Sequence, residues 1–152
     1  MTDYTRLNDG WNAEPNAPDV RITCEGDALR VSFILNSFVF PGYEHGQRAT
    51  LTFPQCTRYR FGPPNDEGWY AGAHGLADPP PWGEFYEIAP AVKRTKAVND
   101  WVTGPAIATA GQSGRHFLFY FRDDTFECEA ADWLLETSER PLGTGRVRAN
   151  DR

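Results

Sequence analysis

The chain has 152 residues, of which 40% are hydrophobic and 24% are charged. This length suits one domain, and the composition is typical of a soluble globular protein, not of a disordered or membrane-spanning one. Asp and Glu outnumber Lys and Arg by 21 to 15, and the net charge of −6 argues against nucleic-acid binding, which relies on a cationic surface. The first residues form no apolar leader, so we expect a cytoplasmic protein without membrane contact.

The first part of the chain changes from an aperiodic lead-in to alternating strands. Residues 1–19 are rich in Asn, Asp and Pro and show no period, so we expect a loose lead-in. Apolar and polar residues then alternate over 20–24 and over 29–35, and this two-residue period predicts strands. The Gly-containing turn at 25–27 joins them into a hairpin.

Two further strands are predicted before a long irregular segment. Alternation over 49–53 and 57–61 indicates strands, with Pro54 at the break between them. Residues 62–83 hold five prolines, and this composition predicts a long loop without regular structure. Long loops in compact domains are often functional.

The second half of the chain predicts one helix and the strongest strand pair. Residues 84–88 indicate a short strand, 92–101 are the best helix candidate, and 104–114 suggest a mobile connection of small residues. The nearly continuous apolar run at 116–121 indicates a strand buried on both faces, and 126–130 its return partner.

These elements predict one mostly β domain over residues 20–139. Residues 133–135 add a last strand or a helical turn, and 140–152 form a flexible tail. The expected architecture is an antiparallel sandwich or partly open barrel built from hairpins, with one short helix. An α+β fold is the alternative.

The three cysteines, Cys24, Cys56 and Cys128, are far apart in the sequence and form no CxxC pair. Zinc knuckles and thioredoxin-type redox sites need such a pair, so neither is expected. Each cysteine lies in a strand-like apolar stretch, where a thiol packs as a small hydrophobic group. We therefore expect reduced thiols with a packing role.

The loop at 62–83 carries the main candidate site. Asn65, Asp66, Glu67 and His74 place an amide, two carboxylates and an imidazole on one constrained segment. Such a group can share acid and base roles or bind a divalent metal. Asn and Asp also occur in loops because they cap turns, so both interpretations stay open.

Three further side chains extend this candidate site. Trp69 and Trp82 lie in the same loop and are candidate binding residues, although an aromatic content of 14% also suits a packed β core. His116 joins the candidate catalytic group if the sheet brings it to the loop; otherwise it is a strand-end residue with one hydrogen bond. No cofactor is predicted, and a divalent metal is left open.

Seven carboxylates occupy the 17 positions from Asp123 to Glu139. Such a series is typical of a solvated face that protects a sheet edge from aggregation. It also suits a surface that attracts a basic protein partner.

Two segments resemble an uncharacterised family of small bacterial proteins. The first contains the sequence PNDE followed by His74, and the second, at 116–128, matches a terminal hairpin of the form HFxFxFxDxTFEC. The resemblance covers less than half of the chain, and the chain departs from the pattern at 68–82 and 90–111. It implies no activity, but it marks for testing Asn65, Asp66, Glu67, His74, His116 and Thr125.

Motifs of phosphate-binding loops, dinucleotide-binding folds, serine hydrolases and HExxH metalloproteases are absent from the sequence. The predicted function is therefore a non-catalytic cytoplasmic binding module, with an immunity or antitoxin protein that neutralises a basic toxin as its specific form. The alternative is a small hydrolase or metal-assisted enzyme that uses Asp66, Glu67 and His74. A small-molecule ligand is also left open.

Overall fold

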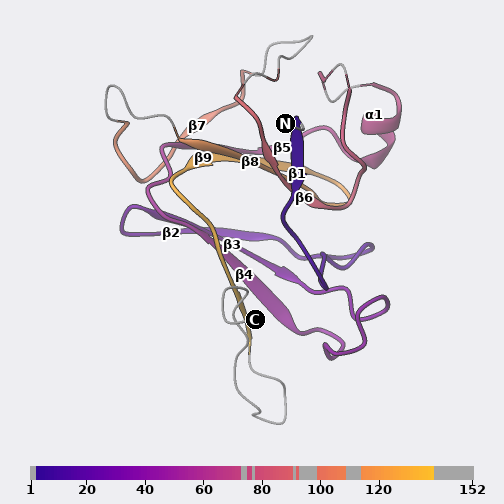
Figure 1. The fold of residues 1–152 in the computed structure, drawn as a ribbon. Helices are drawn as coiled ribbons and strands as arrows, with labels where there is room; N and C mark the ends of the chain where they lie inside the picture. Colours follow the sequence, from indigo (N-terminus) through magenta and orange to yellow (C-terminus); the bar gives the residue numbers. More distant parts are fainter. Residues whose placement is uncertain are drawn as a thin grey trace.

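The computed structural model describes residues 3–72, 75–76, 78–90, 92, 99–108 and 114–138 (Figure 1). These residues form ten strands and one short helix, α1 (Asp66–Tyr70). The strands are β1 (Tyr4–Arg6), β2 (Arg21–Glu25), β3 (Ala28–Ile34), β4 (Arg48–Phe53), β5 (Arg58–Gly62), β6 (Phe85–Ile88), β7 (Val102–Thr103), β8 (Arg115–Tyr120), β9 (Thr125–Ala130) and β10 (Leu134–Thr137).

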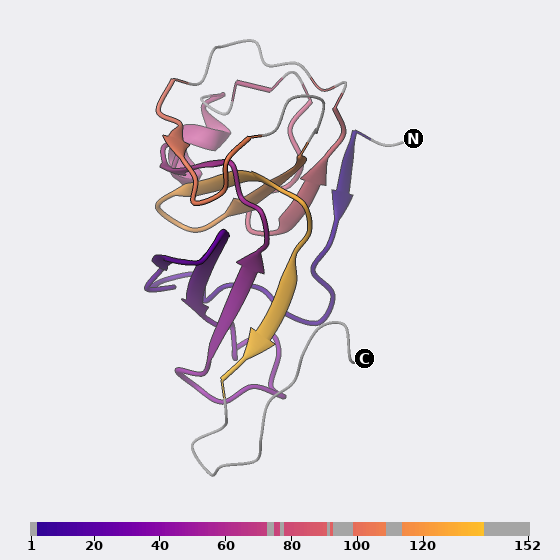
Figure 2. The same cartoon turned by 90° about the vertical axis from the view of Figure 1, so that its left-hand side faces the viewer.

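The described strands form two antiparallel sheets that face each other as a sandwich (Figure 2). The six-stranded sheet has the order β1-β6-β8-β9-β5-β7, and the four-stranded sheet has the order β10-β4-β3-β2. The predicted hairpins β2–β3 and β8–β9 are both present. The mostly β prediction is confirmed, and the described strands do not close into the alternative barrel.

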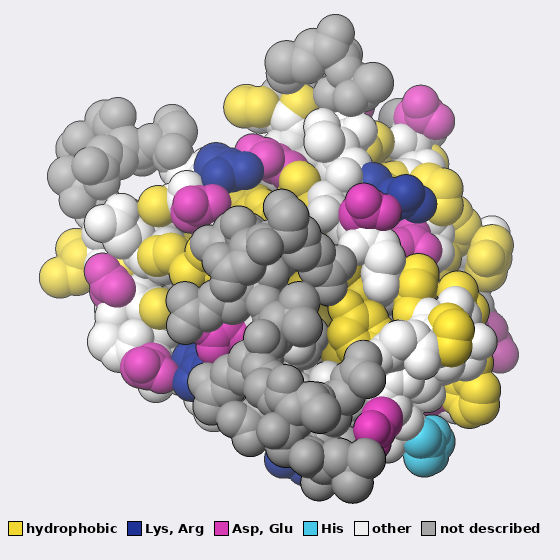
Figure 3. All heavy atoms as spheres, turned by 60° about the horizontal axis from the view of Figure 1, so that its bottom comes forward, with side chains coloured by type: hydrophobic (Ala, Val, Ile, Leu, Met, Phe, Trp, Pro, Cys, Tyr) yellow, Lys and Arg dark blue, Asp and Glu magenta, His cyan; other side chains and the backbone are white. Residues whose placement is uncertain are grey.

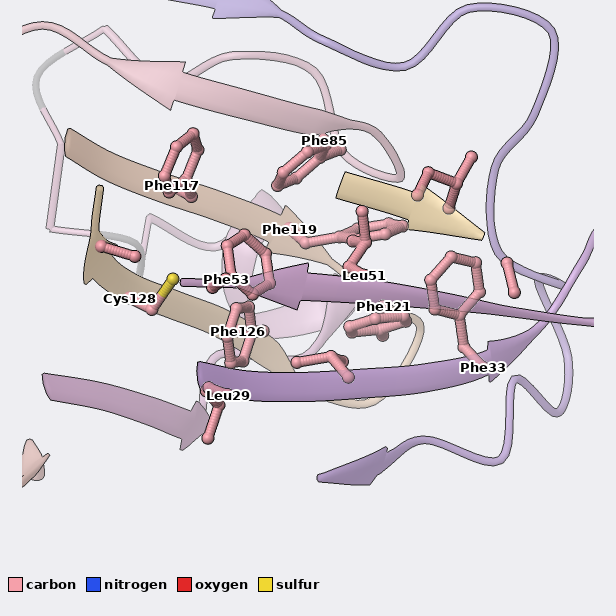
Figure 4. Packing of buried hydrophobic residues seen from close by; sticks show 14 of the residues in the cluster. Leu29, Phe33, Leu51, Phe53, Phe85, Phe117, Phe119, Phe121, Phe126 and Cys128 are labelled. Carbon is pink, nitrogen blue, oxygen red and sulfur yellow. The ribbon is translucent and has the colours of Figure 1, made fainter. Parts of the chain in front are cut away.

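Aromatic side chains from both sheets fill the space between them (Figure 4). Residues of β3 and β4 alternate between buried and partly buried along each strand, as the two-residue period predicts. Rings from opposite sheets contact each other: the centroids of Phe33 and Phe119 are 5.3 Å apart, and those of Phe53 and Phe126 are 5.5 Å apart. The two sheets are therefore joined by one interdigitated core.

The N-terminal segment belongs to the fold instead of forming the loose lead-in that its composition predicts. β1 pairs with β6, and Trp11 is 1% exposed and contacts Phe33 and Phe85. Asn8 Nδ2 donates to the carbonyl of Trp11. The segment has no period because one buried Trp and side-chain bonds to the backbone hold it, not a repeating apolar face.

The helix lies in the segment where the sequence predicts no regular element. Asn65 is its N-cap, and the side-chain oxygen accepts a hydrogen bond of 2.8 Å from Gly68 N. Asp66 and Glu67 occupy the first turn, where negative charge is favourable. The predicted helix at 92–101 and the tail at 140–152 fall largely or wholly outside the described residues. The described part of the chain contains no helix long and apolar enough to cross a bilayer.

The described start of the 104–114 connection is anchored, although its small residues predict mobility. Gly104 N donates to Thr57 O and Ala106 N donates to Cys56 O, each at 2.8 Å. A Cβ at Gly104 would lie 2.4 Å from Cys56 O. Glycine is therefore required for this close approach of two backbones.

A second apolar cluster covers the outer face of the six-stranded sheet. Leu118 and Tyr120 of β8 pack there with Tyr86 of β6, and Trp69 and Trp82 pack against them. This cover explains the continuous apolar run of β8, since side chains on both faces of the strand are buried.

The cysteines differ in exposure. Cys56 and Cys128 are fully buried, whereas Cys24 is exposed on β2, so the expected packing role does not apply to Cys24. A hydrogen bond with Cys128 lowers the pKa of Cys56, whereas burial raises the pKa of the Cys128 thiol.

We predict that one thiol per native chain reacts quickly with Ellman's reagent and that all three react after denaturation. Burial shields Cys56 and Cys128 from the reagent, and Cys24 alone is open to it. Rapid reaction of a Cys24→Ser variant under native conditions would contradict this assignment.

Candidate functional site

A pocket of about 180 Å³ lies beside the start of α1. It is lined by 12–15, Asn36, Asp66, 82–83 and 120–122. These residues come from the N-terminal segment, the β3–β4 connection, α1, the segment before β6 and the β8–β9 turn. Two predicted site residues, Asp66 and Trp82, are among them.

Backbone hydrogen bonds tie the walls of this pocket to one another. Asp66 N donates to Arg122 O at 3.1 Å, which joins the start of α1 to the β8–β9 turn. Asn36 N donates to Asn12 O at 3.0 Å, which joins the β3–β4 connection to the N-terminal segment. These bonds join, in two pairs, four of the five parts of the chain that line the pocket.

Hydrogen-bond acceptors are prominent in the wall. Asn12 Oδ1 is buried and has no hydrogen-bond partner among the described residues, while its Nδ2 donates to Glu84 Oε1 at 3.4 Å. Asp66 adds a carboxylate, of which Oδ1 accepts a hydrogen bond from Glu67 N at 2.8 Å. The carboxylate of Glu14 accepts hydrogen bonds from the backbone of 16–17. This oxygen is closed to solvent, so an N–H group of a ligand reaches it only after the pocket wall opens locally, and the cost of a buried acceptor without a donor favours that pairing.

The two tryptophans of the predicted site pack against the sheet. Trp82 is stacked on Tyr120 with ring centroids 4.6 Å apart, and Trp69 contacts Tyr120 edge-on at 6.0 Å. Trp82 and Tyr120 also line the pocket, so this stack forms a rigid apolar wall beside the acceptors.

The remaining residues of the predicted group do not line the pocket. Asn65 caps α1, and Glu67 is exposed in the first helical turn. His74 lies outside the described residues. Within residues 62–83, the structure thus brings Asp66 and Trp82 to the pocket and leaves Asn65 in a capping role.

His116 lies away from this pocket, on the outer face of the six-stranded sheet. It is four residues before Tyr120 on β8, which at about 3.3 Å per residue is roughly 13 Å along the strand. His116 Nε2 is 2.9 Å from Glu127 Oε1, and Glu127 also pairs with Arg60 at 3.0 Å. The geometry does not join His116 to Asp66.

The Arg60–Glu127 pair is the buried centre of an ionic network. Both side chains are at most 5% exposed, and Arg60 also donates to both oxygens of Asp100, at 2.7 and 3.0 Å, and to the carbonyl of Pro63. The network therefore fixes β5, β8 and β9 and the segment before β7. Buried charges of this kind need complete pairing, because desolvation is expensive.

We predict that Glu127→Ala lowers the free energy of unfolding by about 3–5 kcal/mol, because it leaves Arg60 buried without its partner. The matched control is Glu129→Ala on the same face of β9, where the partly exposed pair with Arg58 contributes at most about 1 kcal/mol. Urea unfolding of both variants measures the difference. Equal losses would contradict a special role for the buried pair.

The acidic series from Asp123 onward is not one solvated surface in its described part. Glu127 is buried, Glu129 pairs with Arg58 at 2.9 Å, and Asp132 pairs with Arg115 at 3.0 Å. Asp123 is 76% exposed in the β8–β9 turn beside the pocket. Burial and the carboxylate of Asp123 raise the pKa of Asp124.

We predict that Asp124→Asn stabilises the protein at neutral pH and that the gain shrinks as the pH falls toward 3.8, the ordinary pKa of Asp. A pKa that is raised in the folded state means that the ionised carboxylate opposes folding, and this cost disappears once the unfolded chain is also protonated. Thermal unfolding across this pH range, with Asp27→Asn as the control, tests the sign. A gain that grows toward low pH would refute it.

Asn12, Asn36 and Arg122 are among the pocket residues that the sequence did not point to. Arg122 and Asn36 each lie two residues after the end of a strand, β8 and β3. Strand ends that meet at one end of a sandwich were the available signal. Nothing in the aperiodic lead-in pointed to Asn12. The described residues hold no group of three His, Cys, Asp or Glu side chains arranged to bind a metal ion.

Comparison of the chain with protein-family models, with curated proteins and with solved structures gave no significant match. The resemblance to a family of small bacterial proteins therefore stays a prediction.

Proposed function

We propose that this protein is a non-catalytic binding module whose pocket receives a basic group from a protein partner. The observation that carries the proposal is the preformed pocket that combines the unpaired Asn12 oxygen, the Asp66 carboxylate and the Trp82–Tyr120 stack.

The size of the pocket favours a single side chain as its occupant. Pockets for cofactors and drug-sized ligands have volumes of about 300–1,000 Å³, whereas this one has about 180 Å³. A nucleotide or a flavin is too large for this space. One long side chain, presented by a larger partner that stays outside, fits it better.

The chemistry of the walls favours a guanidinium or ammonium group. The Asn12 and Asp66 oxygens accept N–H donors, and the Trp82 ring suits the apolar stem of an Arg or Lys side chain. Arg122, also in the wall, is engaged in part, since it donates to Asn16 O at 3.3 Å and its Nε lies 4.0 Å from Asp123.

The wider surface supports a basic partner as well. On the face seen in Figure 3, acidic side chains are scattered among apolar and basic ones, and the whole chain has a net charge of −6. Complementary charge speeds association with a basic protein and disfavours acidic competitors. An immunity or antitoxin protein that neutralises a basic toxin in the cytoplasm is the specific form of this proposal, argued from charge and architecture.

The alternative of a hydrolase or metal-assisted enzyme has less support. It needs several acid–base groups around one point, and Asp66 is the member of the predicted group that lines the pocket, while His116 lies on another part of the sheet.

We predict that a short arginine-rich peptide shifts the amide NMR signals of Asn12, Asn36 and Arg122, whereas a glutamate-rich peptide of equal length does not. Asp66→Asn weakens this binding by at least about tenfold, because a hydrogen bond to a charged group contributes about 1.5–3 kcal/mol.

The matched control is Asp27→Asn, which removes the same charge from the β2–β3 turn at the opposite end of β3. If both variants weaken binding equally, only the net charge matters and the pocket is not the site. If no pocket signal shifts, the proposal is wrong.

A further inference from the structure

β2 is the longest of the edge strands in the described part of the two sheets. It pairs with β3 on one side, and four of its five residues are exposed. None of its residues makes a backbone hydrogen bond to any other described segment. The other side of the strand is therefore open to a further strand.

The register shows which backbone groups point to this open side. Ile34 N, at the end of β3, donates to Pro18 O on the side of β2, while Leu35 N donates to Gln47 O on the side of β4. The N–H and C=O groups of the even-numbered residues of β3 therefore point to β2. Because Arg30 pairs with Thr23, the odd-numbered residues of β2 point their N–H and C=O groups to β3. Ile22 and Cys24 direct their N–H and C=O groups to the open edge.

The side chains of β2 are complementary to a second copy of the same strand. Arg21, Thr23 and Glu25 project from one face of the strand in the order positive, neutral, negative. In an antiparallel pair centred on Thr23, each Arg21 lies opposite the Glu25 of the other copy. Ile22 and Cys24 lie opposite each other as the hydrogen-bonded pairs.

We propose that two copies of this chain associate through antiparallel pairing of their β2 strands, centred on Thr23. The two four-stranded sheets then form one continuous sheet across a two-fold axis, and each copy presents the same surface. This inference is independent of the proposed function, because β2 does not line the pocket.

The charges favour this arrangement over a parallel pairing of the two strands. A parallel pair in register places Arg21 against Arg21 and Glu25 against Glu25, and like charges directly opposite are unfavourable. Within one chain, Arg21 pairs with Asp19 at 2.8 Å and Glu25 with Arg30 at 2.9 Å. These pairs are exposed and weak, so they leave both side chains able to contact a second copy.

The interface is small, so we expect association that depends strongly on concentration. Main-chain hydrogen bonds from five-residue strands bury less area than a permanent dimer needs. Sedimentation velocity from micromolar to millimolar concentration is the suitable measurement.

The first test uses charge reversal. Arg21→Glu and Glu25→Arg each weaken self-association by about tenfold, because each places like charges at both ends of the pairing. A mixture of the two variants restores association, since each Glu then faces an Arg. Arg6→Glu on β1, an edge strand of the other sheet, is the matched control and leaves association unchanged.

The second test fixes the register. In a Cys24→Ser background, Thr23→Cys forms an intermolecular disulfide under mild oxidation by oxidised glutathione, with the two thiols oxidised and glutathione reduced. The two Thr23 residues form a pair without hydrogen bonds, whose Cα separation of about 4.5 Å lies within the range of disulfides. Thr52→Cys on β4 is the control and does not cross-link efficiently.

A protein that stays monomeric at millimolar concentration overturns the proposal. So does a dimer that neither charge reversal weakens, or one in which Thr23→Cys cross-links no better than Thr52→Cys. Dimerisation that survives Asp66→Asn and fails with Arg21→Glu separates this inference from the proposed function.

Discussion

The contact between aromatic rings of the two sheets is the interaction on which the rest of the structure depends. Seven of the ten phenylalanines are buried, and most of them meet in this layer. Such rings bury large apolar areas and prefer edge-on or offset contacts, so they fix both the spacing and the relative orientation of the sheets. The fixed arrangement of the sheets also sets the relative positions of the loops that join their strands, and the pocket lies among these loops.

The six-stranded sheet differs from the four-stranded one because both of its faces are used. Its inner face contributes to the core, and its outer face carries the Trp69–Trp82–Tyr120 cluster together with the Arg60–Glu127 network. The aromatic cluster attaches α1 and the segment before β6 to β8, and the ionic network attaches the segment before β7 to β5. Both sets of contacts fix residues that are not part of a strand. The aromatic contacts in this way hold a proline-rich segment in place as one wall of the pocket.

The sequence predicted those parts of the fold that repeat and missed those that rest on single contacts. The alternation along β3, β4 and β9 gave the strands and their hairpins, because a half-buried strand must show a period of two. Trp11 and the Gly104 contact have no period, since each depends on a partner distant in the chain, and the Asn65 cap is one local hydrogen bond to Gly68 N. For the site, sequence reasoning selected Asp66 and Trp82 but not Asn12 or Arg122, because only the tertiary fold brings these four together.

Net charge alone does not locate a functional surface in this protein. Of the carboxylates on β9, Glu127 is buried against Arg60 and Glu129 is paired with Arg58, so the acidic run that first suggests a partner is largely used to hold the sheet. Asp66 differs because it lies in a pocket wall beside a buried acceptor without a donor. A buried acceptor without a donor costs stability unless something else requires it. The combination of acceptor, carboxylate and aromatic wall is therefore stronger evidence for a binding function than the total of −6.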